Sequence, residues 1–166
     1  MKIRENVHDD RRAARELLLS ANAFITTKAF EFNYEYVTLH ASKRNVGGYR
    51  HFTMAPIDTI VPRALADLWL QDDLELAADQ IRKRDFAPMT QGAFDALACF
   101  VFDMGASDLR QGDLCHCLEL GLIAPAARIL AAHAWRRSDQ RTPRRKRRIA
   151  EALLMQTGRI GVASQR

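Results

Sequence analysis

The stretch Met89–Leu114 reads "MTQGAFDALACFVFDMGASDLRQGDL". Thr90 is a good N-terminal cap, because its hydroxyl can accept a hydrogen bond from a free backbone N–H in the first helical turn. Apolar residues then recur at helical spacing on almost every side, and Gly105 is a typical helix end. A helix that is apolar all round sits in the middle of a core. The stretch therefore predicts the central helix of the fold.

The whole chain fits one domain. It has 166 residues, of which 48% are hydrophobic, so it can build a sizeable core. We expect a mostly helical α+β fold in a single unit over 1–166. A first helix and a small β lobe are predicted over roughly 10–60, a larger helical lobe over 61–158 and a polar tail over 159–166.

Before the central helix, the predicted secondary structure changes from helix to strands and back to helix. The pattern predicts an amphipathic helix from about Asp10 to Phe30. Residues 32–52 are rich in aromatic and β-branched residues, and Gly47-Gly48 marks a turn, which favours a ribbon of two or three strands. Pro62 then begins a run of helices. In its helix we expect the following buried stripe: Leu65, Leu68, Trp69, Leu76 and Ile81.

The formal net charge is +5, which favours an anionic partner: nucleic acid, a membrane surface or an acidic cell-wall polymer. Eight basic residues gather near the C-terminus: Arg136, Arg137, Arg141, Arg144, Arg145, Lys146, Arg147 and Arg148. They form either a solvated basic face or a surface that binds an anionic envelope or phosphate backbones. Trp135 stands alone beside them, so a stacking platform for single-stranded nucleic acid is not expected.

The three cysteines do not form a disulfide framework, because their number is odd and their surroundings are apolar. Cys115-His116-Cys117 supplies at most three closely spaced ligands, so we interpret its cysteines as buried helical thiols rather than a zinc site. The charged N-terminal sequence does not read as a secretory signal, and no stretch approaches the length of a membrane span. We therefore expect synthesis in the cytosol, so that any action outside it needs another route out.

Four segments, taken in order, resemble the phage lysozyme family, the endolysins typified by T4 and P22-type phages. The central stretch is similar to the family's "TQxQFDALVSFAFNxG". Residues 117–135, "CLELGLIAPAARILAAHAW", resemble "LNxGxxxxAAxxFxxW", and residues 144–154, "RRKRRIAEALL", resemble "LVRRRxAERxLF". Upstream, residues 61–77, "VPRALADLWLQDDLELA", look like "ITxxQADxLLxxDLxxA". The resemblance covers roughly 60–158 and implies a lysozyme-like fold.

The family keeps its catalytic residues on the preceding helix end and hairpin. "KAFEF" preserves the phenylalanine-glutamate pair of the family's "xxFEGxxLxAY", which implies that Glu31 holds the catalytic position. "NVGGYRH", residues 45–51, looks like a variant of "TIGYGH" with one extra glycine. The family's aspartate position falls near Leu39 or His40 and its threonine position on or near Asn45, and there is no aspartate between Asp10 and Asp58.

Two hypotheses follow from this resemblance. The first is an endolysin-like muramidase that hydrolyses the bond between N-acetylmuramic acid and N-acetylglucosamine in peptidoglycan glycan strands, with no metal or organic cofactor. Glu31 would be the general acid, Glu35 or His40 would assist, and Asn45 would place the water. Such an enzyme would act at the cell wall after release by a holin or a secretion system. The second is a lysozyme-fold protein that has lost this chemistry and binds a glycan, a nucleic acid or a protein through its cleft or arginine-rich face. In either case we expect a monomer.

Overall fold

The computed structural model describes residues 10–136 and 142–161. Within them, helices dominate and one small antiparallel sheet follows the first helix, which confirms the predicted α+β class. The elements run in this order: a 3-10 turn at Ala14–Glu16, α1 (Ala21–Phe30), β1 (Tyr34–Leu39), β2 (Asn45–Gly48), β3 (His51–Phe52), α2 (Arg63–Arg82), α3 (Gln91–Met104), a 3-10 turn at Ser107–Leu109, α4 (Asp113–Glu119), α5 (Ile123–Arg136) and α6 (Thr142–Thr157).

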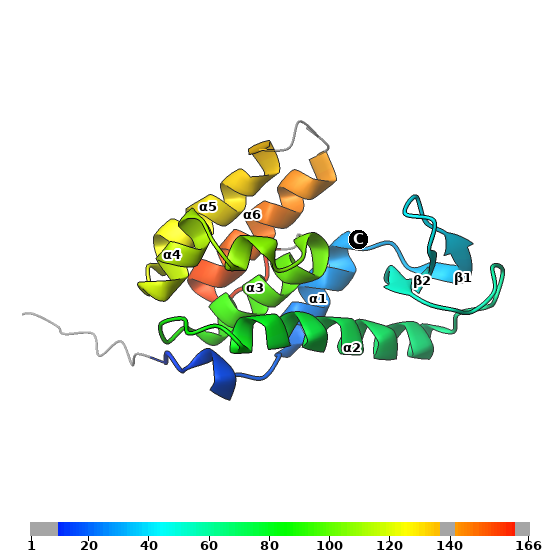
Figure 1. Cartoon of the computed structure of the whole chain (residues 1–166), viewed down its shortest axis with the longest axis horizontal. Coiled ribbons are helices and arrows are strands. Elements are labelled where there is room, and N and C mark those ends of the chain that lie inside the picture. Colours follow the sequence, from blue (N-terminus) through cyan, green and yellow to red (C-terminus); the bar gives the residue numbers. More distant parts are fainter. Residues whose placement is uncertain (1–9, 137–141, 162–166) are drawn as a thin grey trace, which may run out of the picture.

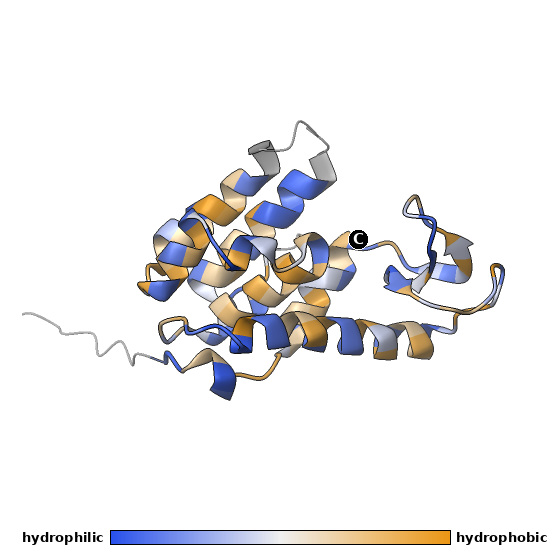
Figure 2. Ribbon diagram, viewed as in Figure 1, coloured by the Kyte–Doolittle hydropathy of each residue, from blue (hydrophilic) through white to orange (hydrophobic). Residues whose placement is uncertain are grey.

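The sheet and the helices α3 to α6 form two lobes, and the long helix α2 runs along both (Figure 1). The larger core surrounds α3 and includes residues from α2, α4, α5 and α6. A smaller core lies between the sheet and the first half of α2, where Val37, Tyr49 and Leu70 are buried. Figure 2 shows hydrophobic residues gathered where the helices face one another. No helix of the described residues is both long and apolar enough to span a membrane.

The central helix forms as the sequence predicts. Thr90 caps α3, because its side chain accepts a hydrogen bond from the backbone N–H of Ala93 at 3.2 Å. Every residue of the range 92–101 is buried. Gly105 ends the helix with a φ of +80°, a backbone conformation that glycine adopts without steric cost.

The first helix begins later than the predicted Asp10. Ser20 caps α1 by accepting a hydrogen bond from the backbone N–H of Asn22, and residues 17–19 ahead of it are not helical. The buried carboxylate of Asp95, on α3, accepts hydrogen bonds from the Ser20 hydroxyl at 2.5 Å and the Ser20 backbone N–H at 3.1 Å. These bonds fix Ser20 in its non-helical conformation and set the start of α1 at Ala21.

The sheet packs on α2 through two glycines. Gly47 and Gly48 lie on β2, which pairs with both β1 and β3. A Cβ atom on Gly47 would approach Val61 to 2.9 Å, and one on Gly48 would approach Ala66 to 2.9 Å. The glycines therefore allow the close contact between the sheet and the start of α2.

The buried side of α2 differs from the predicted stripe. Leu68 and Leu76 are 59% and 64% exposed, so their assignment to the core was wrong. The core side of α2 instead carries these residues: Ala66, Leu70, Leu74, Ala77, Ala78 and Ile81. Three of these six are alanines, whose small side chains let the neighbouring elements approach the helix closely.

Candidate functional site

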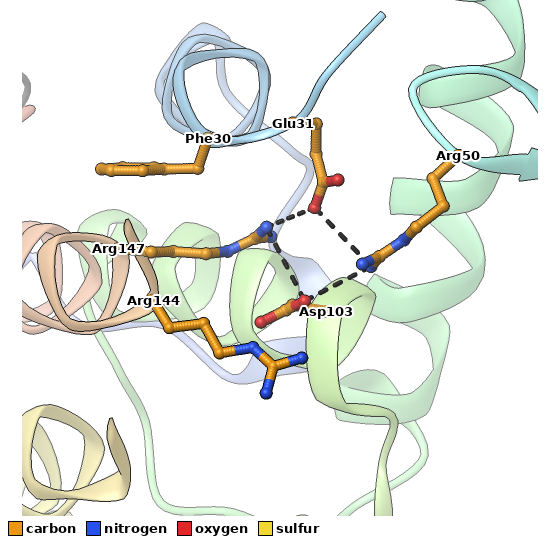
Figure 3. Close-up of a pocket in the computed structure, with 6 residues that line it drawn as sticks. All are labelled: Phe30, Glu31, Arg50, Asp103, Arg144 and Arg147. Carbon is orange, nitrogen blue, oxygen red and sulfur yellow. Dashed lines mark hydrogen bonds and ion pairs between the residues drawn. The ribbon is translucent and has the colours of Figure 1, made fainter. Parts of the chain in front are cut away.

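Glu31 lies where the chain leaves α1 for the sheet. It is the C-cap residue of the helix, and its backbone N–H donates to the carbonyl of Thr27 at 3.1 Å. Its side chain is only 7% exposed, although most glutamates lie at the surface. It lines a small pocket of about 140 Å³ together with Phe30, Arg50, Asp103, Arg144 and Arg147. Figure 3 shows the side chains of Glu31, Arg50, Asp103 and Arg147 converging from the end of α1, the hairpin, α3 and α6.

The Glu31 carboxylate belongs to a network of charges. Arg147, on α6, donates a hydrogen bond to Glu31 Oε1 and another to Glu151 at 3.0 Å. Arg148 forms ion pairs with Glu151 and with Asp103 at the end of α3.

Arg50 closes this network from the hairpin side. Its Nη2 atom lies 3.3 Å from Asp103 Oδ1 and 3.6 Å from Glu31 Oε1 (Figure 3). Three carboxylates and three guanidiniums are thus connected, in a set we call the six-charge network: Glu31, Arg50, Asp103, Arg147, Arg148 and Glu151.

Burial shifts the proton equilibria of this network. It raises the pKa of Glu151 from 4.5 to about 6, even though the adjoining guanidiniums of Arg148 and Arg147 oppose the shift. Burial also tends to raise the pKa of Asp103. There, however, Arg147, Arg148 and Arg50 together outweigh burial and hold that pKa below its ordinary value. Asp103 is therefore a carboxylate at neutral pH.

Arg50 adopts a strained backbone conformation. It lies between β2 and β3 with a φ of +69°, in the left-handed region that costs a residue with a Cβ atom about 1–2 kcal/mol. Its guanidinium also lies 5.7 Å from the centre of the Phe102 ring. The ion pairs with Glu31 and Asp103 offset the strain, and they place a cation between the two lobes.

A larger groove of about 740 Å³ continues from Arg50 and Asp103 between the lobes. Its lining residues come from the hairpin, from α2 and from the end of α3 and the segment after it: His40, Arg50, Phe52, Asp73, Leu76, Ala77, Gln80, Val101, Phe102, Asp103, Gly105, Ala106 and Arg110. His51 supports its wall, because the Nδ1 atom of His51 lies 3.0 Å from Asp73 and its ring stacks on Trp69. The exposed Leu76 thus lines a groove.

Comparison with protein families matches residues 29–151 to the family described as phage lysozyme. The chain belongs to the phage lysozyme family. A search among curated proteins finds no match.

Solved structures agree with this membership. The muramidase domain of SpmX from Asticaccaulis excentricus is 25% identical, with a TM-score of 0.76 over 84% of this chain and 98% of that domain. The endolysin of Escherichia coli O157:H7 phage FAHEc1 is 17% identical, with a TM-score of 0.76 over 88% of this chain and 98% of the endolysin. A P22 lysozyme variant is 18% identical, with a TM-score of 0.70 over 84% and 98% of the two chains. The chain therefore has the lysozyme fold that the sequence predicts.

Only some of the sequence-predicted catalytic residues come together. His40 lines the groove, where its Nδ1 atom lies 2.9 Å from the hydroxyl of Ser42. Asn45 lies elsewhere, since it lines a separate cavity at the hairpin tip and its side-chain amide donates to the carbonyl of Ala55 at 2.9 Å. Glu35 is exposed and lines neither the Glu31 pocket nor the groove. Of the four predicted residues, Glu31 and His40 thus face the interlobe space.

The predicted basic surface divides in two. Arg147 and Arg148 are 4% and 2% exposed, so their prediction as surface-binding residues is corrected: both point inward because three carboxylates hold them. Exposed members of the run are Arg144, Arg145 and Lys146. The remaining predicted residues, Arg136 by its side chain and Arg137 and Arg141 entirely, lie outside the described residues.

Sequence reasoning missed Arg50 and Glu151. The spacing of Arg147 and Glu151, four residues apart on one helix, is a signal that could have found the second. Arg50 is harder to find, but it stands directly before His51, where the resembling "TIGYGH" has a glycine. A large cation at a glycine position of the hairpin is the sequence signal for this site.

The cysteines take no part in the site. All three are free, with Cys99 and Cys115 buried and Cys117 partly buried. No cluster of three or more histidine, cysteine, aspartate or glutamate side chains among the described residues could hold a metal ion.

Proposed function

We propose that this chain binds glycan strands of bacterial peptidoglycan in the groove between its lobes and does not hydrolyse them. The observation that carries the proposal is Arg50, whose guanidinium faces Glu31 at 3.6 Å from the hairpin side. The glycan as ligand rests on membership of the phage lysozyme family and on the shape and lining of the groove.

Hydrolysis of a glycosidic bond passes through a transition state in which the sugar ring carries positive charge. Two carboxyl groups normally flank the bond: one protonates the leaving oxygen, and the other stabilises the positive charge or activates water. Here Glu31 is present, but the hairpin places the cationic Arg50 next to it instead of a carboxylate. A guanidinium repels the developing charge, so this cleft disfavours the transition state.

The groove nevertheless suits a sugar chain. Its lining includes apolar side chains, Phe52, Leu76 and Phe102, together with the polar groups of Gln80 and Arg110. Apolar side chains can pack on the faces of sugar rings, while amide, guanidinium and carboxylate groups can bond to hydroxyls. The groove volume of about 740 Å³ is in the range of ordinary ligand sites.

One observation favours a second candidate, a muramidase that uses Glu31 and His40. His40 lines the same groove as Arg50 and Asp103, and a neutral imidazole can act as a general base. Both arginine contacts of Glu31 use Oε1, so Oε2 is the atom that would deliver a proton.

Sedimentation with purified peptidoglycan sacculi, followed by chromatography of the soluble fraction, tests both candidates. We expect the wild type to sediment with the sacculi and to release no more muropeptide than the Glu31→Gln variant. Release by the wild type that disappears in Glu31→Gln and His40→Ala would establish the muramidase and overturn the loss of hydrolysis. Absence of sedimentation would overturn glycan binding.

A matched pair of variants locates the binding. Leu76→Glu places a charge in the groove, whereas Leu68→Glu makes the same change at a similarly exposed leucine of α2 that does not line it. We expect sedimentation to fall in Leu76→Glu only. Equal behaviour of the two variants would contradict binding in the groove.

A further inference from the structure

The tip of the β hairpin carries a cavity whose charge is not balanced. The cavity measures about 380 Å³ and is lined by Lys43, Arg44, Asn45, Phe52, Thr53 and Met54. Two of these six residues are cations and none is an acid. In the Glu31 pocket, by contrast, two carboxylates lie among the three arginines. The hairpin-tip pocket is therefore suited to a negatively charged group.

Backbone hydrogen bonds fix the turn that carries the two cationic residues of this pocket. The N–H of Lys43 donates to the carbonyl of His40, and the N–H of His40 donates to the carbonyl of Arg44, each at 2.9 Å. Lys43 has a φ of +60°, which turns the chain sharply at the tip. Because this turn is closed by hydrogen bonds, little backbone entropy remains to be lost when a ligand binds.

Arg44 is oriented by an aromatic ring. The central carbon of its guanidinium lies 3.6 Å from the centroid of the Phe52 ring, in a cation–π contact. A guanidinium that stacks in this way keeps its N–H donors in its own plane, available to an oxyanion at its edge. Phe52 and Met54 add apolar surface to the same pocket. The combination fits an oxyanion carried on a short apolar arm.

The hairpin-tip pocket also adjoins the groove, because Phe52 lines both. We propose that it binds a carboxylate of the peptide stem on a glycan strand that occupies the groove. The assignment rests on the proposed glycan binding. It identifies the stem-peptide carboxylate as the reason that the chain would prefer peptidoglycan to a neutral glycan. Inorganic phosphate offers the same oxyanion chemistry, so the experiment includes it.

The test measures the affinity of three probes by calorimetry: a neutral chitin tetrasaccharide, a disaccharide–tetrapeptide muropeptide dimer and inorganic phosphate. We expect the wild type to bind the muropeptide more tightly than the tetrasaccharide. The double variant Lys43→Gln/Arg44→Gln should lose about tenfold in muropeptide affinity, as expected for two charge-assisted contacts at a partly exposed site, and keep its tetrasaccharide affinity. The control Arg63→Gln/Lys83→Gln removes two exposed charges at the two ends of α2, outside the pocket, and should change neither affinity.

A second variant guards against damage to the hairpin. Lys43→Glu leaves the Arg44–Phe52 contact in place and should weaken muropeptide binding at least as much as loss of one cation does. Equal muropeptide affinity in the wild type, the double variant and Lys43→Glu would overturn the proposal. So would variants that lose affinity for the muropeptide and for the tetrasaccharide to the same extent. Phosphate binding that depends on Lys43 and Arg44, with no preference for the muropeptide over the tetrasaccharide, would identify a phosphate site and also overturn it. Failure of both sugar probes to bind the wild type would instead refute the proposed function.

Discussion

Replacement of Arg147 by methionine should destabilise the protein strongly. Arg147 is buried, and it contacts Glu31 directly, Glu151 at 3.0 Å and the carbonyl oxygen of Cys99 at 3.1 Å. Methionine fills a similar volume but offers no donor and no charge. The change would leave three buried carboxylates each short of a partner, because Arg147 also lies 3.8 Å from Asp103.

Removal of one partner from a buried ion pair lowers the free energy of unfolding by about 3–5 kcal/mol. In a domain of this size each kcal/mol lowers the unfolding midpoint by about 2–4 °C, so we expect a fall of roughly 6–20 °C. Lys146→Met is the matched control, because it removes the same charge from the neighbouring, exposed position of α6. It should change the unfolding free energy by no more than about 0.5 kcal/mol.

The remaining pairs of the network make the prediction sharper. When Arg147 and Glu151 are both neutralised, Glu31 still has Arg50, and Asp103 still has Arg148. The double variant Arg147→Met/Glu151→Gln should therefore be more stable than Arg147→Met alone, with a coupling energy of about 1–3 kcal/mol.

Urea denaturation followed by circular dichroism at neutral pH measures five proteins: the wild type, Arg147→Met, Glu151→Gln, the double variant and Lys146→Met. Two results would refute the reasoning. One is a stability of Arg147→Met within about 0.5 kcal/mol of Lys146→Met. The other is a double variant whose losses simply add, which would mean that the charges do not act as a network.

Three further predictions concern other groups. Because the pKa of Glu151 rises from 4.5 to about 6 in the folded state, its contribution to stability is complete below pH 4.5 and is lost as the pH rises through about 6. Across that pH window the unfolding free energy of the wild type should fall by about 2 kcal/mol relative to that of Glu151→Gln, as measured by urea titrations at a series of pH values. Parallel curves of unfolding free energy against pH for the two proteins would contradict this. Burial raises the pKa of Cys99 to about 12, so this thiol should react slowly. Iodoacetamide at mildly alkaline pH should modify the partly buried Cys117 first and Cys99 only in urea, which peptide mass spectrometry would show. The unfolding free energy of Arg50→Gly should lie within about 1 kcal/mol of the wild-type value, because relief of the left-handed backbone strain offsets the lost ion pairs. Arg50→Ala keeps the strain, so it should be about 1 kcal/mol less stable than the glycine variant in the same urea assay. Equal stability of the two Arg50 variants would show that the backbone is not strained.

The fold was predictable where the signals are local. The cap at Thr90, the glycine stop at Gly105 and the apolar run between them decide α3 without help from distant residues. The start of α1 was not predictable in this way, because Asp95, 75 residues along the chain from Ser20, fixes it. The exposed Leu76 was assigned to the core because an amphipathic pattern does not distinguish a groove from an interior.

The site was predictable only in part, for a related reason. The family resemblance pointed to Glu31. The basic residues 144–148, however, were predicted to form one exposed surface. Helical geometry divides it: Arg147 and Arg148 face inward, and Glu151, one turn further along α6, meets both. A run of like charges therefore says little about exposure until the acids within reach on the same helix and across the core are known.

Charge balance explains why Arg50 matters more to the chemistry than to the fold. The other five members of the six-charge network come from α1, α3 and α6, and together they hold three carboxylates against two guanidiniums. Arg50, 30% exposed and from the hairpin, supplies the third cation and brings the network to neutrality. Without it, the network would carry one excess negative charge, and negative charge beside the sugar ring favours an oxocarbenium-like transition state. The hairpin of this chain supplies the opposite charge, which is the reason we propose that the cleft binds a glycan without cleaving it.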